Sequence, residues 1–254
     1  MRESHPALEC KGLTKRFGGL VAVNGIDLRI GVGERRAIIG PNGAGKTTLF
    51  SLISGLYPVT SGLVRLLGRE ITRMPCHRRT SLGLGRTFQI TTLFPTLSVL
   101  DNLVIAAMGL RGMKFQMLRP LSTYRELYRR AEEALDKVGI ARKRVETVKN
   151  LSHGEQRQIE IALALISNPA VILLDEPTAG LSPAESTMMT ATLQKLDPKI
   201  TILIIEHDMD VAFQVAGRIT VLHQGCFFAE GTPEEIRNDS RVQEIYFGTE
   251  EKTC

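Results

Sequence analysis

The stretch of sequence that decides the fold is Gly40-Pro41-Asn42-Gly43-Ala44-Gly45-Lys46-Thr47. It fits the pattern GxxxxGK[ST], which marks a phosphate-binding loop when a strand leads into it and a helix follows it. Both neighbours are present, because residues 34–40 read as a short apolar strand and residues 46–56 place apolar side chains at helical spacing. The loop therefore predicts a site for a phosphate-bearing ligand.

Each residue type in this loop suits the binding of phosphate. Glycines let backbone N–H groups turn inward around phosphate oxygens, and the start of a helix adds partial positive charge. We expect Lys46 to reach the β- and γ-phosphates of a nucleotide and the Thr47 hydroxyl to bind Mg²⁺, with Thr48 as a further phosphate contact. The predicted phosphate-binding residues are Gly40, Pro41, Asn42, Gly43, Ala44, Gly45, Lys46, Thr47 and Thr48.

A second strand supplies the acidic groups that such a site needs. Residues 171–176 read VILLDE, an apolar strand that ends in Asp175 and Glu176, and ligands bind at the carboxyl ends of parallel strands. We expect Asp175 to hold the metal through water, and Glu176, which points the other way, to polarise an attacking water. Two acids at a strand end are structural about as often as catalytic, but beside a phosphate loop they favour nucleotide hydrolysis.

A third motif, LSHGEQ, occupies residues 151–156 just before an apolar helical pattern. Ser152 and Glu155 fit a capping box, so an ordinary helix cap is one interpretation. The other is a second anion site, because a serine beside a glycine at a helix start can bind phosphate. Two phosphate-binding helix starts in one chain suggest a nucleotide that is shared between two subunits.

Composition places the chain among ordinary globular proteins. Of its 254 residues, 43% are apolar and 23% are charged, which excludes disorder and collagen-like repeats. The N-terminus lacks an apolar signal region, and the most apolar stretch, residues 159–175, contains Glu160 and Pro169. That stretch cannot span a bilayer, so any membrane role is expected to be peripheral. Four scattered cysteines favour neither a disulfide framework nor a zinc site, which suits a reducing cytosol.

The charges are unevenly distributed. Lys and Arg exceed Asp and Glu by 9 in residues 1–90 and by 5 in residues 91–150, whereas acids exceed bases by 9 in residues 151–254. A basic first half suits a nucleic acid, an anionic membrane surface or a nucleotide. Charge alone leaves these alternatives open, and plain solvated faces as well.

The order of the predicted elements indicates an α/β protein. Residues 7–40 read as strands, residues 91–150 as helices, and after residue 155 helices alternate with continuously apolar strands. Such strands are typical of a parallel sheet that is covered on both faces. We therefore predict an α/β core with a helical insertion of roughly sixty residues.

Taken together, these motifs resemble the nucleotide-binding subunit of ATP-binding cassette (ABC) transporters, over nearly the whole chain. Residues 40–47 match the Walker A motif of that family, LSHGEQ its signature and VILLDE its Walker B motif. The resemblance adds Gln89 as the Q-loop residue, residues 179–185 (AGLSPAE) as the D-loop, His207 as the switch histidine, and Phe17 as the aromatic that stacks on adenine.

The resemblance also implies a fold. It is a P-loop NTPase core with a mainly parallel sheet, an N-terminal antiparallel β subdomain and an inserted α-helical subdomain. The chain would be a single ABC ATPase domain, residues 1–254. Residues 1–90 and 156–254 would form the core with the β subdomain, and residues 91–155 the helical subdomain that ends in the signature.

The mechanism that the resemblance implies needs two subunits in a head-to-tail dimer, with ATP and Mg²⁺ as cofactors. Each ATP would lie between the Walker A motif of one subunit and the signature of the other. The implied roles are catalysis by Glu176, His207 and Gln89, metal binding by Thr47, Gln89 and Asp175, and nucleotide contacts from the signature by Ser152, Gly154 and Glu155.

Two positions depart from the general family pattern and point to one branch. The signature has His153 where glycine is usual, and the D-loop has Ser182 where aspartate is usual. The stretches DEPTAGLSPAE and IIEHDMDV, and the C-terminal Tyr246-Phe247-Gly248, resemble the ATPases of branched-chain amino acid uptake. Residues 110–122 resemble a lengthened segment in the larger of that system's two ATPases.

The implied function is that of an ATP-hydrolysing, energy-coupling subunit of an importer for branched-chain or hydrophobic amino acids. It would lie peripherally at the cytoplasmic face of the inner or plasma membrane. Its partners would be transmembrane permease subunits, a second ATPase that is identical or homologous, and indirectly a periplasmic or extracellular substrate-binding protein. Nucleic acid is not expected as a partner.

Other transport systems and soluble ATPases are the alternatives. Urea or amide uptake and lipid or lipopolysaccharide export use similar one-cassette subunits. A soluble cassette ATPase that acts on DNA or ribosomes would suit the basic first half. The long coiled coils of DNA-acting cassette ATPases and the two cassettes of the ribosome-acting ones are both missing from this sequence.

Overall fold

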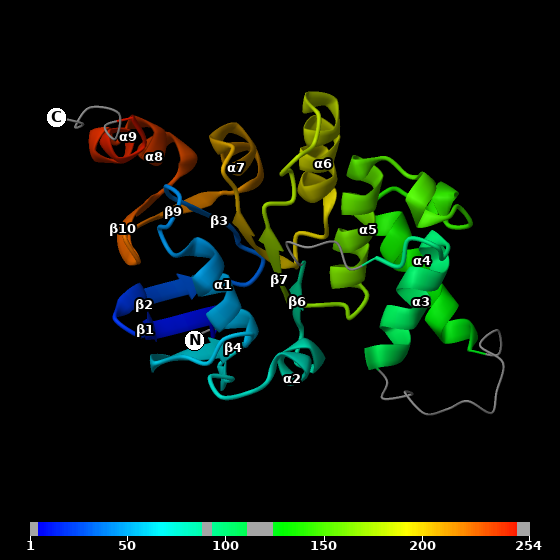
Figure 1. Ribbon diagram of the computed structural model, residues 1–254, viewed down its shortest axis with the longest axis horizontal. Helices are drawn as coiled ribbons and strands as arrows, with labels where there is room; N and C mark the ends of the chain where they lie inside the picture. Colours follow the sequence, from blue (N-terminus) through cyan, green and yellow to red (C-terminus); the bar gives the residue numbers. More distant parts are fainter. Residues whose placement is uncertain (1–4, 88–92, 111–123, 248–254) are drawn as a thin grey trace.

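The computed structural model describes residues 5–87, 93–110 and 124–247, and it contains two sheets (Figure 1). One is antiparallel with strand order β2-β1-β4-β5, and the other has the order β10-β9-β3-β8-β7-β6 and is parallel except for the β9–β10 pair. The antiparallel sheet consists of β1 (Leu8–Phe17), β2 (Leu20–Ile30), β4 (Ser61–Leu66) and β5 (Arg69–Glu70). The second sheet consists of β3 (Arg35–Ile39), β6 (Leu84–Arg86), β7 (Val171–Asp175), β8 (Thr201–Ile205), β9 (Arg218–His223) and β10 (Cys226–Gly231).

The helices fall into three groups around these sheets. Helices α1 and α2 follow the phosphate loop and β5. Helices α3, α4 and α5 form the helical segment at the right of Figure 1, and α6 to α9 flank the last strands. Among the described residues, no helix has the length and apolar character that crossing a membrane requires. The helices are α1 (Lys46–Ser54), α2 (Cys76–Ser81), α3 (Val99–Leu110), α4 (Arg125–Lys137), α5 (His153–Leu165), α6 (Pro183–Lys195), α7 (Met209–Val215), α8 (Pro233–Asn238) and α9 (Ser240–Phe247), with 3-10 turns η2 (Ala141–Lys143) and η3 (Val148–Asn150).

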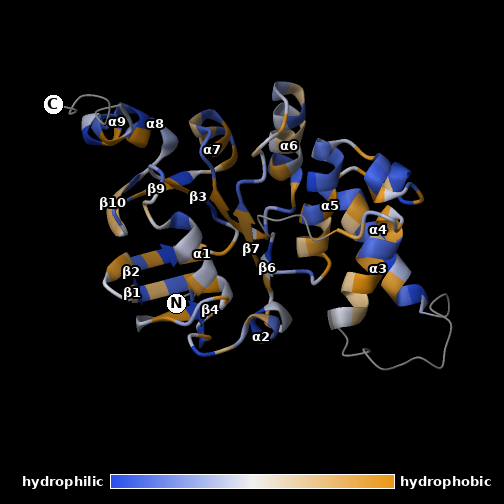
Figure 2. Cartoon of the chain, in the orientation of Figure 1, coloured by the Kyte–Doolittle hydropathy of each residue, from blue (hydrophilic) through white to orange (hydrophobic). Residues whose placement is uncertain are grey.

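The strands of the parallel sheet are apolar throughout because each face packs on a different layer. In β8, Ile202 and Ile204 belong to a core cluster that extends into α3, α4, α5, α6 and α7. The alternate residues Leu203 and Ile205 belong to a second cluster with α1 and the antiparallel sheet. Figure 2 shows the central strands in hydrophobic colours between these layers. The period-2 alternation of side chains therefore joins two cores through one sheet.

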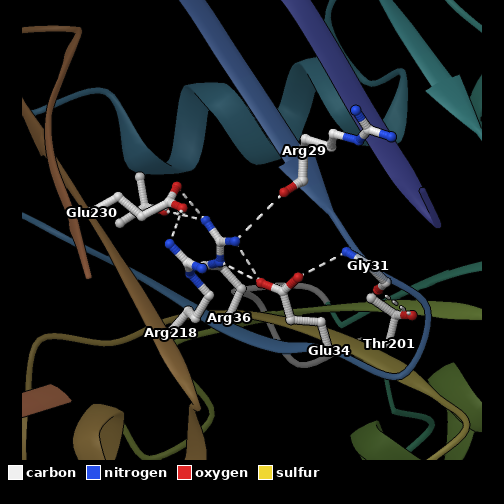
Figure 3. Close-up of polar contacts among 8 residues, drawn as sticks. Arg29, Gly31, Glu34, Arg36, Thr201, Arg218 and Glu230 are labelled. Carbon is white, nitrogen blue, oxygen red and sulfur yellow. Dashed lines mark hydrogen bonds and ion pairs between the residues drawn. The ribbon is translucent and has the colours of Figure 1, made fainter. Parts of the chain in front are cut away.

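A buried arginine ties the two sheets together at the start of β3 (Figure 3). The guanidinium of Arg36 is almost completely buried and donates hydrogen bonds to the carboxylates of Glu34 and Glu230 and to the Thr220 hydroxyl. It also approaches the backbone oxygen of Arg29 in β2 at 3.5 Å. Because Glu230 lies in β10 and Thr220 in β9, one cation links three strands of the parallel sheet to the antiparallel sheet.

The predicted α/β class and the order of the main elements are confirmed. The sequence did not predict β6, β10 and the short helices α2, α8 and α9, because segments of eight residues or fewer carry little periodic signal. Helix α5 begins at His153, just before the proposed end of the helical subdomain at residue 155. Gln89, most of the lengthened segment at residues 110–122, and Gly248 lie outside the described residues.

Candidate functional site

The phosphate loop connects β3 to α1, and the start of α1 is left open for an anion. Gly45 is the N-cap residue in the left-handed region (φ 94°), and a Cβ there would lie 2.4 Å from the backbone oxygen of Ala22. Within the described part of the chain, no side chain caps this helix, and its first turn holds no acid. Helices α5, α6, α7 and α8, by contrast, all begin with a side-chain cap. The free N–H groups of α1 therefore favour an external anion.

Lys46 is folded back onto the loop that precedes it. Its side chain is only 5% exposed, and Nζ donates hydrogen bonds to the backbone oxygens of Gly40 (2.6 Å) and Pro41 (3.0 Å). Burial lowers the pKa of Lys46, and the nearby charges of Glu176 and Asp175 oppose that shift. An ammonium group has three N–H donors. The loop accepts hydrogen bonds from two of them, so the third can still donate to a ligand.

An open cavity of about 690 Å³ brings together residues from five separate parts of the sequence. Its size is in the range of nucleotide-sized ligand sites. Phe17, which is 42% exposed, lines it at the end of β1, with its ring edge-on to Tyr57 at a centroid distance of 5.5 Å and Lys15 Nζ 4.8 Å from its centroid. The remaining lining includes residues 42–48, Glu176, His207 and Gly225.

Asp175 ends β7 as an almost fully buried carboxylate. Its Oδ2 atom pairs with Arg86 Nη2 at 3.3 Å, while Oδ1 is buried and has no hydrogen-bond partner among the described residues. Burial raises the pKa of Asp175, and the charge of Arg86 opposes this shift. A buried oxygen without a partner fits a nearby cation or its bound water.

The donor set fits Mg²⁺ better than a metal that needs a protein cage. Among the described residues, no cluster of three or more His, Cys, Asp or Glu side chains could hold a metal. Mg²⁺ commonly takes one or two carboxylates and completes its ligands with water and substrate phosphates. Asp175 and the Thr47 hydroxyl suit that mode of binding.

Glu176 and His207 are in direct contact. Glu176 Oε1 lies 2.7 Å from His207 Nε2. The backbone of Glu176 is in the left-handed region (φ 50°), and its N–H donates to the Ile205 oxygen at 2.9 Å. A non-glycine residue in this region is strained by about 1 kcal/mol or more, and such strain is common at functional sites. The structure thus brings together two of the three predicted catalytic residues.

The signature forms the predicted capping box at the start of α5. Ser152 Oγ accepts from the Glu155 N–H at 3.3 Å, and Glu155 Oε2 accepts from the Ser152 N–H at 2.9 Å. Glu155 also pairs with Lys143 at 2.6 Å. Partial burial raises the pKa of Glu155, but the hydrogen bonds from Lys143 and Ser152 outweigh it, so the pKa is lowered. Of the residues placed by the structure, those of the signature are absent from the lining of the phosphate-loop cavity.

The contacts of three residues near these sites were not predicted from the sequence. Glu206 is buried beside His207 and accepts hydrogen bonds from the N–H (3.1 Å) and hydroxyl (2.8 Å) of Thr178. Tyr246, whose pKa is raised by burial, contacts the backbone of Gly40 through its hydroxyl. Glu185 reaches from α6 to the signature. Each contact joins residues far apart in the sequence, so no local motif predicts it.

Comparison with known proteins identifies the family. The model of a family described as "ABC transporter" matches residues 23–179, which is more than half of the chain. The chain belongs to the ABC transporter family. A second model, described as "Branched-chain amino acid ATP-binding cassette transporter", matches residues 228–252 of this ABC protein.

Similar proteins cover the ABC protein almost from end to end. The high-affinity branched-chain amino acid transport ATP-binding protein BraF of Pseudomonas aeruginosa is 39% identical, over 96% of this chain and 99% of that protein. LivG of Escherichia coli, described in the same words, is 38% identical over the same shares. The function predicted from the sequence, an ATP-hydrolysing subunit of an ABC transporter, is thereby confirmed.

Solved structures confirm the fold class. The ADP conformation of MJ1267, an ATP-binding cassette of an ABC transporter, superimposes with a TM-score of 0.84 at 29% identity, over 96% of this chain and 100% of that one. A dimeric post-hydrolysis state of the cassette MJ0796 bound to ADP and Pi has a TM-score of 0.73 at 27% identity, over 89% and 98% of the two chains.

Proposed function

We propose that this ABC ATPase couples ATP hydrolysis to the import of branched-chain or other hydrophobic amino acids. The observation that carries the proposal is the match of residues 228–252 to the branched-chain transporter family, together with full-length similarity to BraF and LivG. Residue 228 lies within β10 and residue 247 ends α9, so the matching segment includes the Tyr246 contact to Gly40 of the phosphate loop.

In this proposal ATP occupies the cavity between Phe17 and the phosphate loop. The open start of α1 receives the phosphates, and Lys46 exchanges its backbone acceptors for phosphate oxygens. Thr47 and Asp175, and Gln89 as the resemblance implies, would hold Mg²⁺, which neutralises charge on the phosphates when bound. Phe17 would stack on the adenine ring.

Hydrolysis in this proposal depends on the Glu176–His207 pair. Glu176 would accept a proton from the attacking water, and His207, whose Nε2 lies 2.7 Å from Glu176 Oε1, would contact the γ-phosphate. The second half of the site would come from Ser152, Gly154 and Glu155 of another ATPase subunit, because these residues do not line the cavity of their own chain, as far as the structure describes it.

An apolar cavity of about 310 Å³ supports a permease partner at the membrane face. It lies between α2, β6, α3 and α5, and Phe94 and Ile105 on its rim are 51% and 39% exposed. We propose that an apolar permease segment docks there, close to the helical segment. That contact would place the protein peripherally at the cytoplasmic face of the membrane, with the substrate-binding protein on the other side.

Reconstitution in liposomes tests the proposed function. The chain is combined with the permeases encoded beside it, its substrate-binding protein and any second ATPase, and uptake of leucine, urea and a short amide is measured. We expect ATP-dependent leucine uptake. Glu176→Gln should retain ATP but slow turnover by about 10²–10⁴-fold, the usual scale for loss of a general base. Uptake of urea or the amide without leucine would reject the substrate class, and normal turnover of Glu176→Gln would reject the catalytic assignment.

A further inference from the structure

The carboxylate of Glu185 bridges the starts of two helices. Its Oε1 atom accepts hydrogen bonds from the Ser152 hydroxyl and the Gly154 N–H of α5, both at 3.0 Å. Its Oε2 atom accepts from the N–H (3.1 Å) and the hydroxyl (2.8 Å) of Ser182, the N-cap residue of α6. One side chain therefore caps its own helix and also fills the anion position of the signature.

This contact requires glycine at position 154. A Cβ at Gly154 would lie 2.9 Å from Glu185 Oε1 and about as close to two of its side-chain carbons, so a larger residue would push the carboxylate away. Hydrogen bonds from Ser182, Gly154 and Ser152 hold the pKa of Glu185 at about 2. The group is an anion at any physiological pH, and both helix starts favour it there.

The donors that hold Glu185 are those expected to bind the nucleotide of the other subunit. The Ser152 hydroxyl and the Gly154 N–H each have one hydrogen, so they cannot serve a carboxylate and a phosphate together. Two anions at one helix start would also repel each other. We propose that Glu185 occupies the position of the γ-phosphate in the free chain and must withdraw from α5 for the shared ATP site to close. This inference rests on the proposed function.

One departure from the general family pattern belongs to this contact, and the other lies beside it. Ser182 replaces the usual aspartate and donates its hydroxyl proton to Glu185. His153 replaces the usual glycine and packs toward Gly180 of the D-loop, where an added Cβ would lie 3.5 Å from His153 Nε2. The signature and the D-loop of one chain are thus held together while Glu185 is bound. The D-loop begins three residues after Glu176, so the contact of Glu185 with α5 lies close in sequence to the proposed catalytic carboxylate.

The experiment measures ATP-driven pairing of chains that carry Glu176→Gln. The ATP concentration for half-maximal dimer is determined by analytical ultracentrifugation, with and without Glu185→Gln. Glutamine keeps the size of the side chain and is accepted at this place in a capping box, but it lacks the charge. We expect Glu185→Gln to lower that concentration by about tenfold, the scale for one favourable charge interaction at a helix start in each of two sites.

Helix α8 offers a matched control. Thr232 and Glu235 form the same capping box with proline at the same position, far along the chain from the signature. Glu235→Gln removes a capping carboxylate in the same way and should leave the half-maximal ATP concentration unchanged. Equal or weaker pairing of Glu185→Gln relative to its parent would overturn the proposal, because the carboxylate would then be only a structural cap.

A second measurement tests the role of Glu185 in the isolated chain, so it applies even if two identical chains do not form a dimer. Failure of Glu176→Gln to pair at any ATP concentration contradicts a homodimer in the proposed function, not the role of Glu185. In the Lys46→Ala chain, the backbone amide signal of Gly154 is followed by NMR while inorganic phosphate is added. We expect Glu185→Gln to make Gly154 respond at a lower phosphate concentration. An equal response in both chains, or none with Glu185→Gln, would overturn the proposal.

Discussion

Glu206 is a buried acid that precedes His207 in the chain and contacts Thr178. Burial raises its pKa from 4.5 to about 7, against the opposing effect of the hydrogen bonds from Thr178. The folded chain therefore keeps a proton that the unfolded chain releases. The stability that this proton provides is complete below about pH 4.5, declines as the pH rises, and is lost above about pH 7.

Glu206→Gln should remove this dependence on pH. The amide oxygen can still accept both hydrogen bonds from Thr178, but it carries no charge at any pH. Relative to the natural chain, the free energy of unfolding of Glu206→Gln should therefore rise between pH 5 and pH 8, by up to about 3 kcal/mol from the pKa difference. Urea unfolding at four pH values measures it. A constant difference between the chains over this range would contradict the shifted pKa.

The residues that could be predicted from the sequence are those whose role follows from their neighbours in the chain. Lys46 and Asp175 belong to short motifs, and the Ser152–Glu155 capping box depends on local helix geometry. The partner of Ser152 could not be predicted in this way. Glu185 reaches it only because α6 packs beside α5, and nothing at position 185 in the sequence distinguishes that contact from a simple cap.

Among the elements, helix α1 has its C-terminal carbonyl groups capped by a residue of another helix. Its last turn contains no basic residue, and the backbone oxygens of Leu52 and Ile53 accept hydrogen bonds from Arg79 of α2 at 2.8 and 2.7 Å. Arg79 is almost completely buried and also donates to the oxygens of Met74 and Thr72. Burial lowers its pKa, and its charge lies at the negative end of the helix that carries the phosphate loop.

Arg79→Met should therefore destabilise the chain strongly. The variant keeps an apolar side chain but removes the charged donor from four carbonyl groups, of which that of Leu52 also accepts from the Gly55 N–H. Breaking a buried charged interaction costs about 3–5 kcal/mol. Arg78 is the neighbouring exposed arginine on the same helix, so Arg78→Met serves as the control and should change stability by less than about 0.5 kcal/mol. The midpoint of urea unfolding measures both. Similar midpoints for the two variants would show that Arg79 does not hold α1.

The sequence predicted the elements whose burial leaves a clear apolar pattern, and it missed the elements that are too short to show one. Continuous apolar strands such as β7 and β8 are buried on both faces, so their sequence alone announces a parallel sheet. Strand β6 is only three residues, Leu84–Arg86, and pairs with β7 at the edge of the sheet, so pairing rather than composition makes it a strand. In α1, Leu56 fits the helical spacing but lies beyond the C-cap Gly55 and is exposed.

At the scale of the whole molecule, the chain has two helix starts that suit an anion, and they belong to different parts of the fold. The start of α1 opens into the phosphate-loop cavity and has no internal cap within the described residues. The start of α5 lies outside that cavity, beside the helical segment, and is occupied by Glu185. This separation of the two helix starts is what we expect if a nucleotide is shared between two subunits.

Mixing two inactive chains tests this arrangement. Ser152→Arg blocks the signature, at a cost of about 0.5–2 kcal/mol for the lost cap, but it leaves the phosphate loop of the same chain intact. ATP affinity of the isolated Ser152→Arg chain should therefore stay nearly unchanged, while ATP-driven pairing and hydrolysis are lost. Lys46→Ala removes the cation that we propose binds the β- and γ-phosphates, so ATP affinity and hydrolysis should both fall.

In a head-to-tail dimer of one Ser152→Arg chain and one Lys46→Ala chain, both lesions fall in the same composite site and the other site is intact. Part of the ATPase activity should therefore return in the mixture, provided that one intact site suffices, although each variant alone is inactive. If the natural partner is a homologous ATPase, that partner carries one of the two lesions instead. Titration with a fluorescent ATP analogue measures the nucleotide affinity of each isolated chain, and ATPase assays measure the activity of the mixture. Equal loss of ATP affinity in the isolated Ser152→Arg and Lys46→Ala chains would place the signature in the nucleotide site of its own subunit, and a shared site would then be wrong.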